Sequence, residues 1–353
     1  LGEAYNSASD GPSVAPGISR QLFLVADTLE ECMTIQSANI NISVKSADKN
    51  FIKELKGKCI INGIRIKNTR LITGSNGKHQ IILMARSVGR GCISIRRLLS
   101  VIACCSNTGY YSDNMNRTII NEEFHQYVFV EEDRFRILSG VSRINKGKER
   151  YNGDNFLMSH PDCGKAIAAI ADGMGCGKRA FIESRMVIEL IENCIKAGFD
   201  EKAALELVNS AYIAGGGMGN PVTVDMSIID CQTAYMHCIK LGAVSTFIKR
   251  ESCVEIIKST TLPIGVLEKV DYDCTTKKLY DGDYVVMVSD GILDNFPCIN
   301  KEEQMADVIS SISVREPNAM AAHILKQSLS CHNNKPSDDC TVMVIGLFDT
   351  YRK

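Results

Sequence analysis

The stretch AAIADGMGCGKRA, Ala168–Ala180, ends an apolar run at Asp172 and continues with three glycines at alternate positions. Asp-Gly is a common turn dipeptide, so this stretch alone predicts only a turn after a strand. A second apolar run, YVVMVSDGIL, ends in the same way at Asp290 and Gly291. Two strands therefore end in an acid followed by glycine, and the fold has to explain both.

Further acids precede apolar runs instead of following them. Asp338 and Asp339 stand before CTVMVIGLF near the C-terminus, and Asp154 opens the run DNFLMS. In an antiparallel sheet, the C-terminal end of one strand lies beside the N-terminal start of its neighbour. We therefore expect these acids to converge with Asp172 and Asp290 at one rim of an antiparallel fold.

Length and charge limit the class of protein. The 353 residues favour two domains, each with its own core. The 40 Lys and Arg against 41 Asp and Glu give a net charge of -1, so no overall field attracts nucleic acid or an anionic membrane. We predict no nucleic-acid partner. Since no apolar stretch reaches the roughly 20 residues of a spanning helix, we also expect no membrane segment in this chain.

The cysteines indicate a reducing, cytoplasmic setting. Their number is 15, which is odd, and their spacing shows neither a disulfide framework nor a CxxC pair. The six histidines are scattered, so no zinc pattern appears.

The patterning along the chain predicts three parts. Residues 1–19 are rich in Gly, Ser, Ala and Pro and are expected to form a flexible lead-in. Residues 20–136 mix short strand-like and helical runs, which indicates a small α+β domain. In residues 137–353, two adjacent helices precede a series of strands, and two more helices precede a closing strand. Strands and helices grouped in this way indicate antiparallel sheets flanked by helices rather than a parallel βαβ fold.

The first of these helices, expected over about 180–199, carries apolar residues at intervals of four, namely Ile182, Met186, Leu190 and Cys194. This spacing indicates a helix, and Gly198 is expected to cap its C-terminus.

A rim of carboxylates without His or Cys suits hard divalent cations such as Mg²⁺ or Mn²⁺. Crowded acids raise one another's pKa unless a cation neutralises them, so convergence implies metal. Gly173 lets its own backbone carbonyl approach an ion without a side chain in the way. Two ions about 3.5–4 Å apart clamp the oxygens of an in-line phosphoryl displacement and activate water. The residues alone therefore favour phosphoester hydrolysis.

Several motifs in register carry a resemblance to a known family. Over residues 137–349 they follow the family's order: GVSRINKGKERYNGDNF, AIADGMGCGKRA, TVDMSIIDCQ, KLGAVSTFIKR, LPIG, VVMVSDGILDNF and DDCTVMV. The chain resembles the phosphatase domain of the stage II sporulation protein E family, bacterial metal-dependent, type 2C serine/threonine protein phosphatases. The resemblance implies an α+β fold, an αββα sandwich of two antiparallel sheets flanked by helices. It also implies two Mn²⁺ or Mg²⁺ ions and hydrolysis of phosphoserine or phosphothreonine in a protein.

The resemblance assigns roles position by position. It makes Asp172 and Asp290 the catalytic acids, with Asp172 bridging both ions. Gly173 offers its carbonyl, Asp154 holds one ion and Asp290 the other. Asp338 matches the first acid of the family's closing motif and completes the metal ligands.

Some positions depart from the family or stay open. Asp339 is the second choice for the closing ligand, and Asp225 is a second-choice metal residue whose alternative is a structural role. Met174 stands where many eukaryotic relatives carry a histidine that donates a proton, so the leaving serine takes its proton from water or another residue. The eukaryotic phosphate-binding arginine has no direct counterpart, and Lys148 and Arg150 are the nearby candidates.

The resemblance also implies a partner and a setting. The expected substrate is a phosphoserine on an anti-sigma factor antagonist protein, whose dephosphorylation activates a sporulation sigma factor. Residues 20–136 are interpreted as a regulatory domain and residues 137–353 as the phosphatase domain. Both are interpreted as the cytoplasmic portion of a membrane-anchored parent at the division septum, touching the membrane only through a region absent from this chain. A homodimer stays open. The alternatives are a stress-response phosphatase of the same fold acting on another antagonist, and a non-catalytic binding module with this fold.

Regulation is expected at the helices that follow Asp172, residues 178–214, with Lys178, Arg179 and Glu183 as candidate regulatory residues. We hypothesise that the regulatory domain packs on these helices and biases the metal site between competent and incompetent states.

Overall fold

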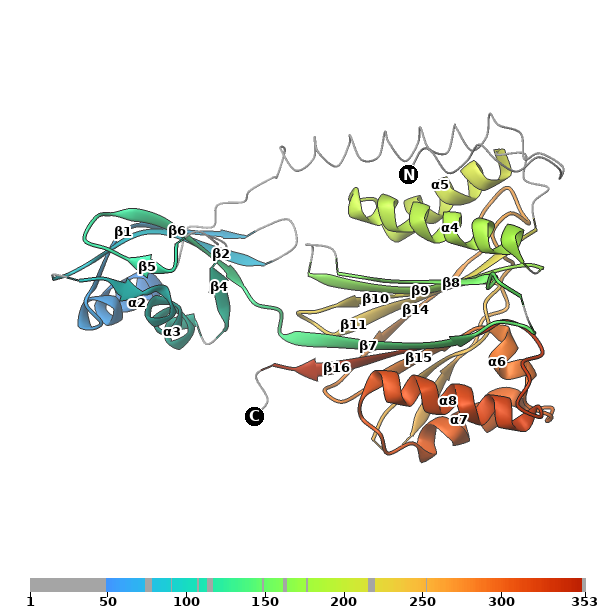
Figure 1. Cartoon of the computed structure of the whole chain (residues 1–353). Helices are drawn as coiled ribbons and strands as arrows, with labels where there is room; N and C mark the ends of the chain where they lie inside the picture. Colours follow the sequence, from blue (N-terminus) through green and yellow to red (C-terminus); the bar gives the residue numbers. More distant parts are fainter. Residues whose placement is uncertain are drawn as a thin grey trace.

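The computed structural model describes residues 49–73, 78–89, 91–106, 108–112, 117–147, 149–160, 164–175, 177–214, 220–251 and 253–350. The expected lead-in, residues 1–19, lies outside the described residues, as do residues 20–48 of the expected regulatory domain. Figure 1 shows a small N-terminal module beside a larger, layered sandwich.

Two five-stranded antiparallel sheets form the centre of the sandwich, in the orders β14-β11-β10-β9-β8 and β13-β12-β15-β16-β7. The first sheet contains β8 (Asp154–Ser159), β9 (Lys165–Gly173), β10 (Val222–Asp230), β11 (Tyr235–Leu241) and β14 (Asp273–Lys278). The second contains β7 (Phe135–Ile144), β12 (Thr246–Lys249), β13 (Val254–Ile257), β15 (Tyr284–Val288) and β16 (Cys340–Asp349). The unbroken apolar runs of β15 and β16 fit strands that are buried on both faces.

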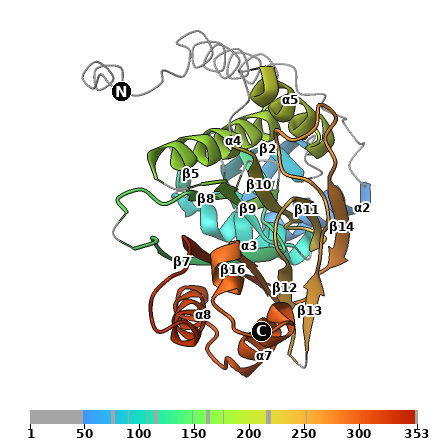
Figure 2. The same cartoon turned by 90° about the vertical axis from the view of Figure 1, so that its right-hand side faces the viewer.

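Helices cover the outer face of each sheet, as Figures 1 and 2 show. The first sheet carries α4 (Lys178–Lys196) and α5 (Glu201–Ala214), and the second carries α6 (Asp290–Asp294), α7 (Lys301–Ser311) and α8 (Pro317–Cys331). Three apolar layers result, one between α4 and the first sheet, one between the two sheets and one between the second sheet and α8. They contain Ile191, Ile170 and Ile324, respectively. The expected αββα sandwich is confirmed.

The buried face of α4 includes two of the spaced apolar residues, Leu190 and Cys194. It also includes Ser184 and Ile191, whereas Ile182 is 43% exposed. An interval of four residues drifts around a helix of 3.6 residues per turn, so the spaced series leaves the buried face at its N-terminal end.

The N-terminal module is a small α+β unit with its own core, which includes Leu55, Ile102 and Phe129. Its helices are α2 (Lys49–Ile61) and α3 (Ile95–Ser106). One sheet has the order β1-β2-β6-β4 and another pairs β3 with β5. These strands are β1 (Ile64–Thr73), β2 (His79–Ser87), β3 (Ile93–Ser94), β4 (Tyr110–Ser112), β5 (Ile119–Ile120) and β6 (His125–Glu131).

The module joins the sandwich where β6 leads into β7. Nζ of the buried Lys78 lies 2.9 and 3.0 Å from the two carboxylate oxygens of Asp133, and Phe135 N–H donates to Cys231 O at 2.8 Å. Lys78 also lies against Gly164, just before β9 begins. Since β9 runs from this junction to Gly173, the module attaches about 27 Å from the end of β9 that carries Asp172.

For the part of the regulatory domain that the structure describes, which begins at residue 49, the hypothesised packing on the helices after Asp172 is not seen. Within the described residues, no helix or strand of the module packs substantially on α4 or α5, and Figure 1 shows the module beyond the end of the sandwich. The strand β7 begins at Phe135, two residues before the expected domain start at 137. The domain boundaries themselves stay predictions. Among the described helices, none combines the length and apolar content that crossing a bilayer requires.

Candidate metal centre

The first pair of acids meets where β8 begins and β9 ends. The antiparallel register places Asp154 directly opposite Asp172, and β10 places Thr223 on the other side of Asp172. Asp154 is only 1% exposed. The turn that follows Asp172 is fastened by Met174 N–H, which donates to Pro221 O at 3.0 Å.

The second pair comes from neighbouring strands of the other sheet. Asp290 follows β15 and opens the short helix α6, and Asp338 lies two residues before β16. A Cβ on Gly291 would lie 2.2 Å from Asp339 O, so this crossing requires glycine. The two strand ends are thereby packed against each other, which fixes the position of both acids.

The charges of the other three acids all act on Asp172. Burial raises the pKa of Asp172 to about 9, and the charges of Asp154, Asp290 and Asp338 add to this rise. Burial likewise raises the pKa of Asp154 to about 6, against the lowering effect of nearby Thr341 and Ser289 hydroxyls.

Asp290, at the solvent edge of the rim, also has a raised pKa. Desolvation by its surroundings is the first cause, and the charges of Asp294 and Asp338 follow. Three of the four acids thus have raised pKa values, and a bound cation would favour their ionised forms.

The surroundings of the buried Asp154 carboxylate indicate that this site suits a cation. No hydrogen bond of good geometry reaches either carboxylate oxygen of Asp154, although the hydroxyls of Thr341 and Ser289 lie near enough to lower its pKa. A buried carboxylate without such a bond is costly unless a charge compensates it. An all-oxygen donor set suits Mg²⁺ or Mn²⁺. In the described part of the chain no three His, Cys, Asp or Glu side chains already stand in ligand geometry, so binding requires small side-chain shifts.

Gly173 is the expected backbone ligand, and its surroundings require a residue without a side chain. A Cβ there would lie 2.5 Å from Ala180 O in the first turn of α4. Gly173 N–H donates to Gly153 O at 3.3 Å, which draws the main chain after Asp172 toward the residue before Asp154.

The structure gives the two adjacent acids of the closing motif different surroundings. Asp339 is buried, and its carboxylate accepts hydrogen bonds from Lys146 N–H at 2.7 Å and Gly153 N–H at 2.6 Å. Asp338 is nearly half exposed and lies 3.4 Å from Lys146 Nζ. Since the carboxylate of Asp339 is already used to hold the loop before β8, Asp338 is the better candidate for the metal.

Asp225 lies deeper, on β10 opposite Ile170. Its carboxylate is 2.8 Å from Nζ of the buried Lys240, and the Thr246 hydroxyl donates to it across the two sheets. This ion pair favours the structural role over a third ion.

The candidate regulatory residues lie in the first turns of α4. Arg179 Nε donates to Glu183 Oε1 at 2.9 Å, and Lys178 and Arg179 are exposed. Arg150, proposed for phosphate, has its guanidinium 6.0 Å from the ring centroid of Tyr151. Lys148 lies outside the described residues. Lys146, two positions earlier, is the basic residue that reaches the rim. The sequence gives no reason to prefer it, because the acids that it contacts lie about 190 positions further along the chain.

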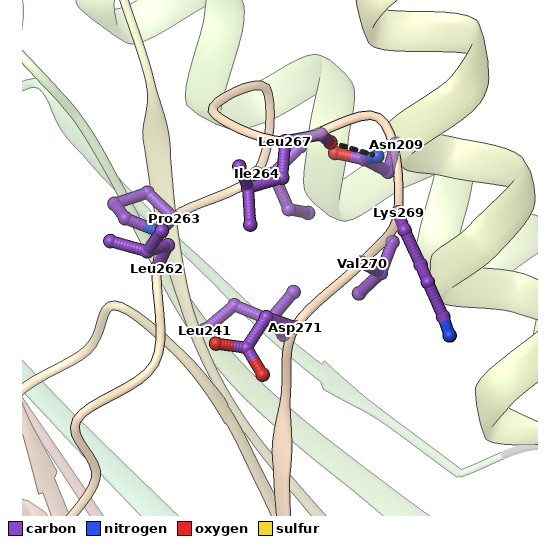
Figure 3. A pocket seen from close by; sticks show the side chains of 9 residues that line it. All are labelled: Asn209, Leu241, Leu262, Pro263, Ile264, Leu267, Lys269, Val270 and Asp271. Carbon is purple, nitrogen blue, oxygen red and sulfur yellow. Dashed lines mark hydrogen bonds between the residues drawn. The ribbon is translucent and has the colours of Figure 1, made fainter.

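A separate hollow lies between α5 and the loop that follows β13 (Figure 3). It is lined by Asn209, Leu241, Leu262, Pro263, Ile264, Leu267, Lys269, Val270 and Asp271. The Asn209 amide donates to Leu267 O at 2.9 Å and Glu268 O at 3.1 Å. None of the rim acids lines this hollow. The hydrogen bonds of Asn209 there fasten the loop to α5.

Comparison with known proteins agrees with this geometry. The family described as Stage II sporulation protein E (SpoIIE) matches residues 162–348, more than half of the chain. The chain belongs to this family. It is accordingly a member of the PP2C-type serine/threonine phosphatases, whose members depend on metal.

Two curated SpoIIE relatives are similar over the sandwich. The protein of Bacillus subtilis (strain 168) is 32% identical over 212 residues, which are 60% of this chain and 26% of the relative. That of Priestia megaterium is 30% identical over 210 residues, 59% of this chain and 36% of the relative. The chain thus spans about a quarter to a third of these relatives.

Two solved structures from Bacillus subtilis SpoIIE are also similar. One, the PP2C phosphatase domain with a fragment of the regulatory domain, has a TM-score of 0.66 and 25% identity, covering 98% of this chain and 100% of that chain. The other, the phosphatase domain in a crystal form without domain swapping, has a TM-score of 0.51 and 29% identity, covering 63% and 96%.

Proposed function

We propose that this chain is a metal-dependent protein-serine/threonine phosphatase. The observation that carries the proposal is the buried Asp154, which no hydrogen bond of good geometry reaches, directly opposite Asp172, whose pKa is raised to about 9. Acids so disposed cost folding free energy unless the site binds cations. Membership of a phosphatase family supports the same reading.

The proposed ligand sets follow the two strand pairs. Asp154, Asp172 and the Gly173 carbonyl would hold one divalent cation, and Asp172, Asp290 and Asp338 the other. A bound pair of such ions supplies an activated water and stabilises the charge that develops in phosphoryl displacement. Met174, which is 48% exposed, offers no proton, so the leaving serine oxygen would take its proton from water or from another residue.

We further propose that the substrate is a phosphoserine on an anti-sigma factor antagonist protein. Dephosphorylation of this antagonist would activate a sporulation sigma factor. The relatives named stage II sporulation protein E support this assignment. By the same argument, the chain would act on the cytoplasmic side of a membrane-anchored parent at the division septum.

The test is phosphate release from two phosphorylated antagonist proteins, one of the sporulation type and one of the stress-response type, with Mn²⁺ titrated in. Asp172→Asn and Asp290→Asn should each abolish release, while Asp307→Asn, the same exchange at an exposed position of α7, should keep it. Faster release from the stress-response protein would reassign the substrate. No release from either protein by the folded wild-type chain would indicate a non-catalytic binding module.

A further inference from the structure

Lys146 lies against the acid rim through two independent contacts. Its side-chain Nζ is 3.4 Å from Asp338 Oδ1, and both side chains are nearly half exposed. Its backbone N–H donates to Oδ1 of the buried Asp339 at 2.7 Å. Asp339 therefore fixes the main chain of Lys146, while Asp338 attracts the ammonium group.

The loop around Lys146 is held at a definite place beside Asp154. The second carboxylate oxygen of Asp339 accepts from Gly153 N–H at 2.6 Å, and Asn152 Oδ1 accepts from Asp154 N–H at 2.9 Å. The same buried acid thus fastens both ends of residues 146–153. This holds the Lys146 ammonium group beside Asp338 at the rim.

Other basic side chains near the rim pair with acids outside the proposed ligand set. Arg179 pairs with Glu183, and Lys301 pairs with Asp294. Within the described residues, Lys146 is the basic residue whose ion pair includes one of the four rim acids.

The ion pair is of the kind that exchanges readily. Exposed pairs contribute only about 0–1 kcal/mol, and lysine carries its charge on a flexible stem. A divalent cation at Asp338 attracts the carboxylate more strongly than a single ammonium charge does. Once Asp338 holds a cation, its attraction for the ammonium group is weaker, and a phosphoryl oxygen bound at the rim would compete for Lys146.

We propose that Lys146 binds the substrate by exchanging partners. Its ammonium group pairs with Asp338 in the metal-free protein and contacts a phosphoryl oxygen once Asp338 holds a cation. This inference rests on the proposed function. It gives one residue two opposite effects, because the positive charge opposes metal binding and favours phosphate binding.

The test separates these effects from activity. Lys146→Met removes the charge, Lys146→Arg keeps it, and Lys53→Met, at an exposed position of α2 in the N-terminal module, is the matched control. Mn²⁺ is titrated calorimetrically into the substrate-free chain, and inorganic phosphate is then titrated into the Mn²⁺-loaded chain. In parallel, kcat/KM is measured on a phosphoserine peptide.

Lys146→Met should bind Mn²⁺ roughly two- to fivefold more tightly, because a repelling charge is lost. It should bind phosphate about tenfold more weakly and lose about tenfold in kcat/KM, the size of one lost charge-assisted contact. Lys146→Arg should stay close to the wild type, and Lys53→Met should change none of the three quantities.

Unchanged phosphate binding in Lys146→Met would overturn the inference. So would a joint loss of Mn²⁺ and phosphate binding, since that would mean Lys146 only supports the loop. A wild-type chain that binds phosphate through Lys146 but releases none from phosphoserine would support the inference and contradict the proposed phosphatase activity.

Discussion

The adjacent acids Asp338 and Asp339 have different roles because their surroundings differ. Asp339 is buried and accepts two backbone N–H groups, from Lys146 and Gly153, whereas Asp338 faces the rim. A buried carboxylate that satisfies backbone donors stabilises the fold, because removing it leaves those donors unpaired. An acid at the rim is available to a cation.

Substitution should separate these roles. Asp338→Asn should keep the melting temperature of the metal-free protein and lose Mn²⁺-dependent phosphate release. Asp339→Asn should lose about 2 kcal/mol of unfolding free energy, since an amide cannot accept both N–H groups. Chemical denaturation and Mn²⁺ titration of both variants measure this. Equal loss of stability in the two variants would show that the division of roles is wrong.

The raised pKa of Asp172 predicts how pH acts on the metal-free protein. Its ordinary value is about 3.9, and in the fold it is about 9. A raised pKa means that the stability contribution is fully present below the unfolded value and is lost as pH rises toward the folded value. The metal-free fold should therefore lose stability between about pH 4 and pH 9, and a bound cation should remove this loss because it replaces the proton.

Thermal melts at pH 6, 7 and 8 test this with and without Mn²⁺. The increase in melting temperature caused by Mn²⁺ should grow with pH, and Mn²⁺ binding should release protons that calorimetry in buffers of different ionisation enthalpy detects. Asp172→Asn should remove most of the pH dependence. An Mn²⁺ effect that is independent of pH in the wild type would contradict the shared, protonated site.

At the scale of elements, two glycines let helices start close to strands. A Cβ on Gly140 of β7 would lie 2.2 Å from Asn318 N at the start of α8, and one on Gly173 would lie 2.5 Å from Ala180 O in α4. In both cases the neighbouring atom belongs to the backbone of the helix, so the helix would have to shift to accommodate a Cβ.

Gly140→Ala and Gly173→Ala should each cost about 1–3 kcal/mol of unfolding free energy, the usual cost of overpacking. Only Gly173→Ala should also weaken Mn²⁺ binding, because Gly140 lies on a strand that carries none of the rim acids. Urea denaturation and Mn²⁺ titration compare the two. If Gly140→Ala weakened Mn²⁺ binding as much, the effect would come from general loosening of the sandwich.

The arrangement of the strand ends could be predicted from the sequence, whereas several contacts between distant residues could not. The paired DG motifs and the acids before DNFLMS and CTVMV predicted the antiparallel rim, because strand ends and strand starts meet by geometry. The place of Ser184 on the buried face of α4 was not predicted, because its side chain is polar and is satisfied there by donating to Gly153 O at 2.6 Å. The roles of Asp339 and Lys146 were missed because both depend on contacts between distant parts of the chain.

At the scale of the whole molecule, the module and the acid rim lie at opposite ends of β9. The junction is held by the buried Lys78 and by Asp133. Any influence of the described module on the rim has to cross the sandwich, and the junction itself should serve mainly to orient the two parts.

Lys78→Met should therefore increase hydrogen exchange and proteolysis near residues 131–135 while leaving Mn²⁺ affinity within about twofold of the wild type, since distant sites usually act independently. Lys53→Met, at an exposed position of α2, is the control. A larger change in Mn²⁺ affinity in Lys78→Met would show that the junction transmits a signal to the metal site.

The central claim is that Asp154, Asp172, Asp290 and Asp338 form one site for two cations. Anomalous diffraction from Mn²⁺-soaked crystals tests it most directly. We predict two peaks about 3.5–4 Å apart, both beside Asp172, one shared with Asp154 and the other with Asp290 and Asp338. No peak at this rim at saturating Mn²⁺, or a single peak at Asp225, would contradict the account.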